Sequence, residues 1–153
     1  MIKIGDKIPD FELKDQNGND FELKDHLGKG KIILYFYPKD ETLGCTKEAC
    51  AFRDSYESFT DAGAKVIGIS SDSIKSHKQF AEKYNLPFTL LSDPGSKVRK
   101  LFKVQKTLGI LPGRTTFVLN KDGIVIYAFN SQFRFSEHIK KALKIIRENK
   151  NER

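Results

Sequence analysis

Apolar and polar positions change their period several times along this chain, and each change predicts an element. The segments 11–15 and 21–25 both read FELKD, with alternating apolar and polar positions, and Asn17-Gly18 lies between them. This pattern is typical of a β-hairpin. The segment 31–37, KIILYFY, is apolar at almost every position. It therefore predicts a central strand that is covered on both faces.

After Pro38 the apolar period becomes helical. Ala49, Phe52, Tyr56 and Phe59 fall on one stripe, which predicts a helix from residue 45 onward. The remaining pattern predicts a strand at 64–70, a helix at 73–84, a short strand at 88–93 and a short helix at 95–104. A two-stranded hairpin at 114–120 and 123–129 follows, and a last helix begins at an N-cap, Ser136. The inward stripe of the 73–84 helix includes His77, for which we expect partial burial and no role as a metal ligand.

The order of these elements is βαβ followed by ββα. It predicts an α/β protein with the thioredoxin-like fold, in which helices flank a mixed central sheet and an N-terminal β-hairpin is added. The chain has 153 residues, enough for one compact domain with a substantial core. Because no linker-like composition interrupts the pattern, we expect residues 1–153 to form a single domain.

Composition excludes several classes of protein. Apolar residues make up 39% of the chain and charged residues 31%, a balance typical of globular proteins. No apolar run is long enough to span a membrane, and the N-terminus shows no secretory signal pattern. We therefore expect a cytoplasmic protein that does not bind membranes, in which a stable structural disulfide would be unusual.

The net charge is +7, which raises the possibility of nucleic-acid binding. Lys and Arg are nevertheless mostly interleaved with Asp and Glu, and the densest basic run, 138–153, has the pattern of an amphipathic helix with a solvated polar face. The aromatic residues fall on apolar stripes and do not form an exposed stacking surface. We expect no specific nucleic-acid partner.

Both cysteines of the chain, Cys45 and Cys50, lie on one short segment. Gly44 and the start of the apolar stripe place Cys45 in the first turn of its helix, where free N–H groups and the helix dipole favour a thiolate. Counting back four positions from Ala49 places Cys45 on the inward face. Cys50 is rotated from it by about 140°, onto the polar face.

The five-residue step between the cysteines has a mechanical consequence. In a helix, residues i and i+5 have Cα atoms about 8–9 Å apart, whereas a disulfide requires about 7 Å or less. A bond between them therefore requires the helix start to unwind, which predicts a folded dithiol and a locally unfolded disulfide. Spacing alone leaves open a redox pair and two inert buried thiols, whereas a zinc site lacks nearby ligands.

The segment 37–54, YPKDETLGCTKEACAFRD, contains Pro-x-x-x-Thr-x-x-Cys and resembles the active-site signature of the peroxiredoxins. With Glu48, Cys50 and Phe-Arg-Asp at 52–54, it is similar to the peroxiredoxin Q group, also called bacterioferritin comigratory protein. The similarity extends over most of the chain, through segments 5–18, 66–93 and 113–123. Leu43 departs from the family, which commonly has proline there, and the loop 107–113 has an uncommon spacing.

The resemblance implies a peroxidase that reduces hydrogen peroxide and organic hydroperoxides. Cys45 matches the peroxidatic cysteine, and Cys50 the resolving cysteine that forms an intramolecular disulfide with it. Thr42 matches the family's threonine, whose hydroxyl lies near the sulfur. Arg114 matches the arginine that a later strand brings to the thiolate, and Pro38 matches the proline that shields the pocket. Thioredoxin or a similar dithiol is the implied reductant, and the implied oligomeric state is a monomer.

Two further expectations complete the sequence-based hypothesis. Glu48 is expected to pair with a cation or to hold Arg114, and no motif indicates a metal, nucleotide or other cofactor. The alternative function is a general thiol–disulfide oxidoreductase of thioredoxin type. Such a protein typically uses Cys-x-x-Cys, however, and here four residues separate the cysteines.

Overall fold

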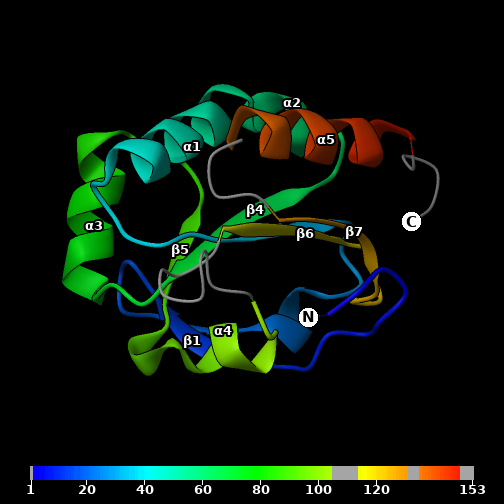
Figure 1. Ribbon diagram of the computed structural model, residues 1–153, viewed down its shortest axis with the longest axis horizontal. Coiled ribbons are helices and arrows are strands. Elements are labelled where there is room, and N and C mark those ends of the chain that lie inside the picture. Colours follow the sequence, from blue (N-terminus) through cyan, green and yellow to red (C-terminus); the bar gives the residue numbers. More distant parts are fainter. Residues whose placement is uncertain (1, 105–113, 131–134, 149–153) are drawn as a thin grey trace.

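The computed structural model describes residues 2–104, 114–130 and 135–148 (Figure 1). Seven strands form one sheet in the order β2-β1-β5-β4-β3-β6-β7. The strands are β1 (Glu12–Asp15), β2 (Asp20–Glu22), β3 (Ile32–Phe36), β4 (Lys65–Ser70), β5 (Thr89–Ser92), β6 (Thr115–Leu119) and β7 (Val125–Asn130). The helices are α1 (Leu43–Asp54), α2 (Tyr56–Asp61), α3 (Ile74–Lys83), α4 (Lys97–Leu101) and α5 (Phe135–Glu148), with short 3-10 turns at Leu23–His26 and Pro94–Ser96.

The central strands are covered on both faces, as the apolar run at 31–37 predicted. Strand β3 pairs in parallel with β4 and antiparallel with β6, so the sheet is mixed. Side chains of β3 alternate between two buried clusters. Tyr35 belongs to the cluster that includes residues of α1, α2 and α5, and Phe36 to the cluster that includes residues of α4 and the N-terminal segment. Figure 1 shows α1, α2 and α5 on one side of the sheet and α4 on the other. The thioredoxin-like arrangement is thereby confirmed.

The N-terminal hairpin is confirmed for its first strand and for the beginning of its second strand. Leu13 pairs with Phe21 across β1 and β2, and the hairpin joins the sheet at the side of β5. Its expected second strand, 21–25, is wrong beyond Glu22, because Leu23–His26 form a 3-10 turn. That turn buries the Leu23 side chain and stacks the ring of His26 on Phe21 at a centroid distance of 4.2 Å.

Two expected helix boundaries are also wrong. The helix expected from residue 45 begins at Leu43 and is interrupted at Ser55, after which α2 starts. Across this break the rings of Phe52 and Phe59 come together, with centroids 5.8 Å apart. Helix α5 already includes Phe135, so Ser136 lies inside it and is not its N-cap. The described helices include none with the length and apolarity that a membrane span requires.

Candidate active site

Cys45 is the third residue of α1, and its side chain is buried, with 2% exposure. The chain leaves β3 at Phe36 and reaches the helix through the loop 37–42. The N–H of Thr46 then donates to the carbonyl of Thr42 at 2.9 Å and closes the first turn. The sulfur therefore lies at the positive end of a 12-residue helix, as the sequence predicted.

Arg114 reaches this sulfur from the other side. It directly precedes β6, whose Thr115 is paired with Phe36 at the end of β3, so the sheet itself brings Arg114 beside the loop that carries Cys45. Its Nη2 donates to Cys45 Sγ at 3.4 Å, and its side chain is 2% exposed. A buried cation that donates to sulfur stabilises the negative charge of a thiolate.

Glu48 holds Arg114 in place. It lies one turn after Cys45 on α1, and its Oε1 accepts from Arg114 Nη1 at 2.5 Å. Burial raises the pKa of Glu48 to about 7, although the charge and the hydrogen bond of Arg114 act to lower it. Burial also acts to lower the pKa of Arg114, but Glu48 and Cys45 raise it above its ordinary value. Arg114 stays charged, therefore, while Glu48 titrates near neutral pH.

A second buried layer surrounds Glu48. His138 of α5 places Nδ1 4.0 Å from Glu48 Oε2 and 2.6 Å from Thr116 Oγ1 on β6. Tyr35 of β3 stacks on Phe52 with ring centroids 4.5 Å apart, and burial is the main cause that raises its pKa well above its ordinary value. The Tyr35 hydroxyl thus keeps its proton, and the acid at Glu48 is enclosed by groups from α1, α5 and the sheet.

Thr42 and Pro38 lie in the loop between β3 and α1. Thr42 occupies the N-cap position of α1 and is exposed, and its hydroxyl donates to the carbonyl of Lys39 at 2.8 Å. Pro38 is half-buried. The expected contact of the Thr42 hydroxyl with the sulfur and the shielding role of Pro38 both stay predictions, and the loop 107–113 that precedes Arg114 lies outside the described residues.

Cys50 lies on the same helix as Cys45 and is half-buried, and both thiols are free. Helix α1 is continuous from Leu43 to Asp54, so the two Cα atoms are separated by about 8–9 Å of regular helix. The structure therefore shows a dithiol state, in which a disulfide between these residues is geometrically excluded.

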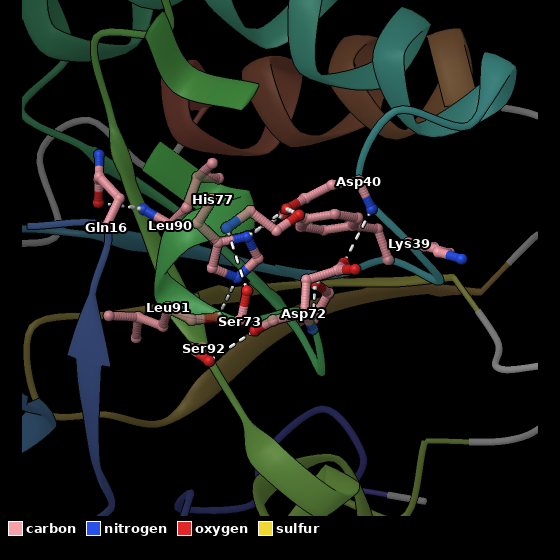
Figure 2. A network of polar contacts seen from close by, with 12 residues as sticks. Gln16, Lys39, Asp40, Asp72, Ser73, His77, Leu90, Leu91 and Ser92 are labelled. Atoms are coloured by element: carbon pink, nitrogen blue, oxygen red, sulfur yellow. Dashed lines mark hydrogen bonds and ion pairs between the residues drawn. The ribbon is translucent and has the colours of Figure 1, made fainter. Parts of the chain in front are cut away.

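Sequence reasoning missed a buried polar pair beside this site, Asp40 and His77 (Figure 2). His77 was expected to be only partly buried. In the structure the two side chains are 1% and 0% exposed, and His77 Nδ1 lies 2.6 Å from Asp40 Oδ2. A signal was available, because a histidine on an apolar helix stripe requires a buried partner.

A thiol that is buried at a helix start and held by an arginine is suited to attack small oxidants. A second thiol on the same helix can then close a disulfide when the helix opens. On a thioredoxin-like sheet, these features define the class of the thiol peroxidases.

The chain belongs to the AhpC/TSA family, whose model matches residues 4–128, and within it to the peroxiredoxin Q group. It is 58% identical to a chloroplastic peroxiredoxin Q of Triticum aestivum over 146 residues, which cover 95% of this chain and 67% of that one. Peroxidoxin BcpB from Mycobacterium tuberculosis superposes with a TM-score of 0.90 at 40% identity, covering 97% and 98% of the two chains. Xanthomonas campestris peroxiredoxin Q gives a TM-score of 0.85 at 32% identity, covering 92% and 91%.

The comparison overturns the expected cytoplasmic location. The relatives from Triticum aestivum, Sedum lineare and Arabidopsis thaliana, each matched over 95% of this chain, are named chloroplastic. The expectation depended on the lack of a secretory signal pattern, and this feature does not distinguish the cytoplasm from a plastid.

Proposed function

We propose that Cys45 is the peroxidatic cysteine of this thioredoxin-dependent peroxidase and that Cys50 is its resolving cysteine. The observation that carries the assignment is the contact of Arg114 Nη2 with Cys45 Sγ at 3.4 Å. Cys50 lies on the polar side of the same helix and is half-buried. The two thiols therefore have different environments, which suit one for attack on peroxide and the other for a later step.

In the first step the Cys45 thiolate attacks one oxygen of a hydroperoxide. A sulfur–oxygen bond forms and the oxygen–oxygen bond breaks, so Cys45 is oxidised to a sulfenic acid. The leaving oxygen takes a proton and departs as an alcohol, or as water when the substrate is hydrogen peroxide. Arg114 donates to the attacking sulfur, so its charge lies beside the reacting atoms and stabilises the charge that develops on the leaving oxygen.

In the second step the Cys50 thiolate attacks the sulfur of Cys45. A sulfur–sulfur bond forms, the sulfur–oxygen bond breaks, and hydroxide leaves and takes up a proton as water. Because the two residues are about 8–9 Å apart in the helix, the first turns of α1 must unwind before this bond can form. A dithiol of thioredoxin type then reduces the disulfide and is itself oxidised.

We further propose that the protein acts as a single-domain monomer. Both cysteines are on one helix of one chain, so the disulfide requires no second subunit. The seven strands belong to a single sheet, which supports one domain. Light scattering of the reduced and oxidised protein tests the oligomeric state, and a dimer mass in either state contradicts the proposal.

The decisive experiment measures peroxide consumption with a thioredoxin system in wild type, Cys45→Ser and Cys50→Ser. We expect Cys45→Ser to lose turnover. Cys50→Ser should react once and leave an oxidised Cys45 that mass spectrometry detects. Thioredoxin-linked turnover at the wild-type rate in Cys45→Ser refutes the assignment of the nucleophile, and turnover in Cys50→Ser refutes the assignment of the resolving residue.

A further inference from the structure

A buried polar network joins the loop after β3 to α3, outside the contacts between Cys45 and Arg114 (Figure 2). At its centre His77 Nδ1 lies 2.6 Å from Asp40 Oδ2, and His77 Nε2 lies 3.0 Å from the carbonyl oxygen of Leu91. His77 belongs to α3 and Leu91 to β5, whereas Asp40 belongs to the loop that leads to α1. The network therefore ties this loop to two elements that are distant in sequence.

The geometry fixes the hydrogen on one nitrogen of His77 and requires a shared proton at the other. A carbonyl oxygen only accepts, so His77 Nε2 carries a hydrogen and donates it to Leu91. At 2.6 Å, His77 Nδ1 and Asp40 Oδ2 must share a proton, because two lone pairs at that distance repel each other. A buried pair of this kind is expensive to separate, since each group would lose its partner away from water.

Asp40 is held by three further hydrogen bonds. Its Oδ1 accepts from the Tyr37 hydroxyl at 2.6 Å, and its Oδ2 accepts from the Ser76 hydroxyl at 2.9 Å. Its backbone N–H donates to Asp72 Oδ2 at 2.8 Å. One ligand atom each from Asp40, Asp72 and His77 lie within 4.8 Å of one another, as in a metal site. These atoms are already engaged in hydrogen bonds, however, so the arrangement is that of an anchor.

The anchored residue lies immediately before a strained one. Glu41 has a φ of +64°, in the left-handed region that residues with a Cβ rarely adopt. It connects Asp40 to α1, which begins at Leu43, and Cys45 follows two residues later. A strained residue persists only where the structure on both sides fixes it. Loss of the anchor at Asp40 would let Glu41 relax and would change the direction in which the helix starts.

We propose that the buried pair His77–Asp40 positions the active-site loop: it holds residues 37–42 against α3, keeps the first turn of α1 wound, and so controls how often Cys45 leaves Arg114 to meet Cys50. His77 and Asp40 are positioning residues, because they act on the sulfur through the backbone of the loop. The inference rests on the proposed function for its kinetic consequence, whereas its structural part concerns the reduced protein alone.

The test compares three variants of α3. His77→Leu removes the imidazole and its hydrogen bonds, and His77→Asn keeps an amide near the position of Nδ1. Phe80→Leu, one turn further on, is the control. Phe80 is fully buried on the same helix, so its truncation lowers stability, but its ring cannot hydrogen-bond to Asp40. If His77→Leu does not fold, Ser76→Ala removes a weaker bond to the same carboxylate oxygen and is compared with Phe80→Leu in its place.

The first measurement is hydrogen exchange of the Asp40 and Thr46 amides in the reduced protein, without peroxide. Loss of a buried hydrogen bond to a charged group predicts exchange about 10- to 100-fold faster in His77→Leu, with recovery of most of the protection in His77→Asn. For Ser76→Ala we expect these amides to exchange about 3- to 10-fold faster. Equal exchange at these amides in His77→Leu and Phe80→Leu, after correction for global stability, overturns the proposal, whatever the outcome for the peroxidase assignment.

The second measurement follows disulfide formation after one equivalent of hydrogen peroxide, by rapid quench and alkylation. We expect the rate of this step to rise in His77→Leu by a factor similar to that of the amide exchange, and oxidation of Cys45 beyond the sulfenic acid to fall. Faster exchange without faster disulfide formation refutes control of the reaction. The proposed function is tested separately, by the loss of thioredoxin-linked peroxide consumption in Cys45→Ser.

Discussion

Glu48 provides a quantitative test of the site, because it is a buried acid whose pKa lies near 7. The relevant change is Glu48→Gln, which replaces the carboxyl group by an amide of the same shape. The glutamine carbonyl can still accept from Arg114 Nη1, as Glu48 Oε1 does. The variant therefore resembles wild type with Glu48 permanently protonated.

The magnitude follows from the difference between the folded and the ordinary pKa. Burial raises the pKa of Glu48 from 4.5 to about 7 in the folded protein. The folded state binds this proton more tightly than the unfolded state, so the stabilisation is present in full below pH 4.5 and is lost as the pH rises through 7. The corresponding change in the free energy of unfolding is about 3 kcal/mol.

The assay is urea or guanidinium unfolding of wild type and Glu48→Gln, with both cysteines reduced, at intervals from pH 4.5 to 8. The two proteins share every other titrating group, so their difference isolates residue 48. We expect similar stability at pH 4.5 and an advantage for Glu48→Gln of about 3 kcal/mol at pH 8. A difference that stays constant across this range would refute the reasoning that Glu48 titrates near neutrality.

Three further changes test other contacts. Arg114→Lys keeps a charge but loses the planar fork whose two nitrogens donate separately to Glu48 and Cys45, so rapid quench and alkylation should show reaction with peroxide slowed by about 100- to 1,000-fold; an unchanged rate contradicts the role of the guanidinium. Gly68→Ala would place a Cβ 2.8 Å from the ring of Tyr35, and we expect chemical denaturation to show a loss of about 1–3 kcal/mol. At Glu41, with its positive φ, glycine should be more stable than valine by about 1–2 kcal/mol, and equal stability of the two variants would show that no strain is present.

The local pattern along the chain predicted most of the fold and part of the site. The continuous apolar run of β3 and the helical stripe around Cys45 are local patterns, and the strand and helix that they predicted are present. The end of the hairpin was not, because the burial of Leu23 and the stacking of His26 on Phe21 are tertiary contacts that no local period contains. The break at Ser55 was missed for the same reason.

The site shows the same division between local and distant information. Cys45, Cys50 and Glu48 lie within six positions, and helix geometry relates them directly. Arg114 lies 69 positions from Cys45, and only the resemblance to a family connected them. His77 is 37 positions from Asp40, and its burial on an apolar stripe indicated only that some partner existed.

The contacts at the two ends of α1 indicate which cysteine moves when the disulfide forms. Toward its C-terminus the helix buries Phe52 completely, and Arg53 Nη1 donates to the carbonyl of Tyr84 at 2.7 Å. Its first turn contains Leu43, which is 74% exposed, and a glycine, so unwinding there exposes little apolar surface. Opening from the N-terminus is therefore the less costly route. In the proposed mechanism Cys45 therefore leaves Arg114 and moves toward Cys50, against the bond from Arg114 and the proposed anchor at Asp40.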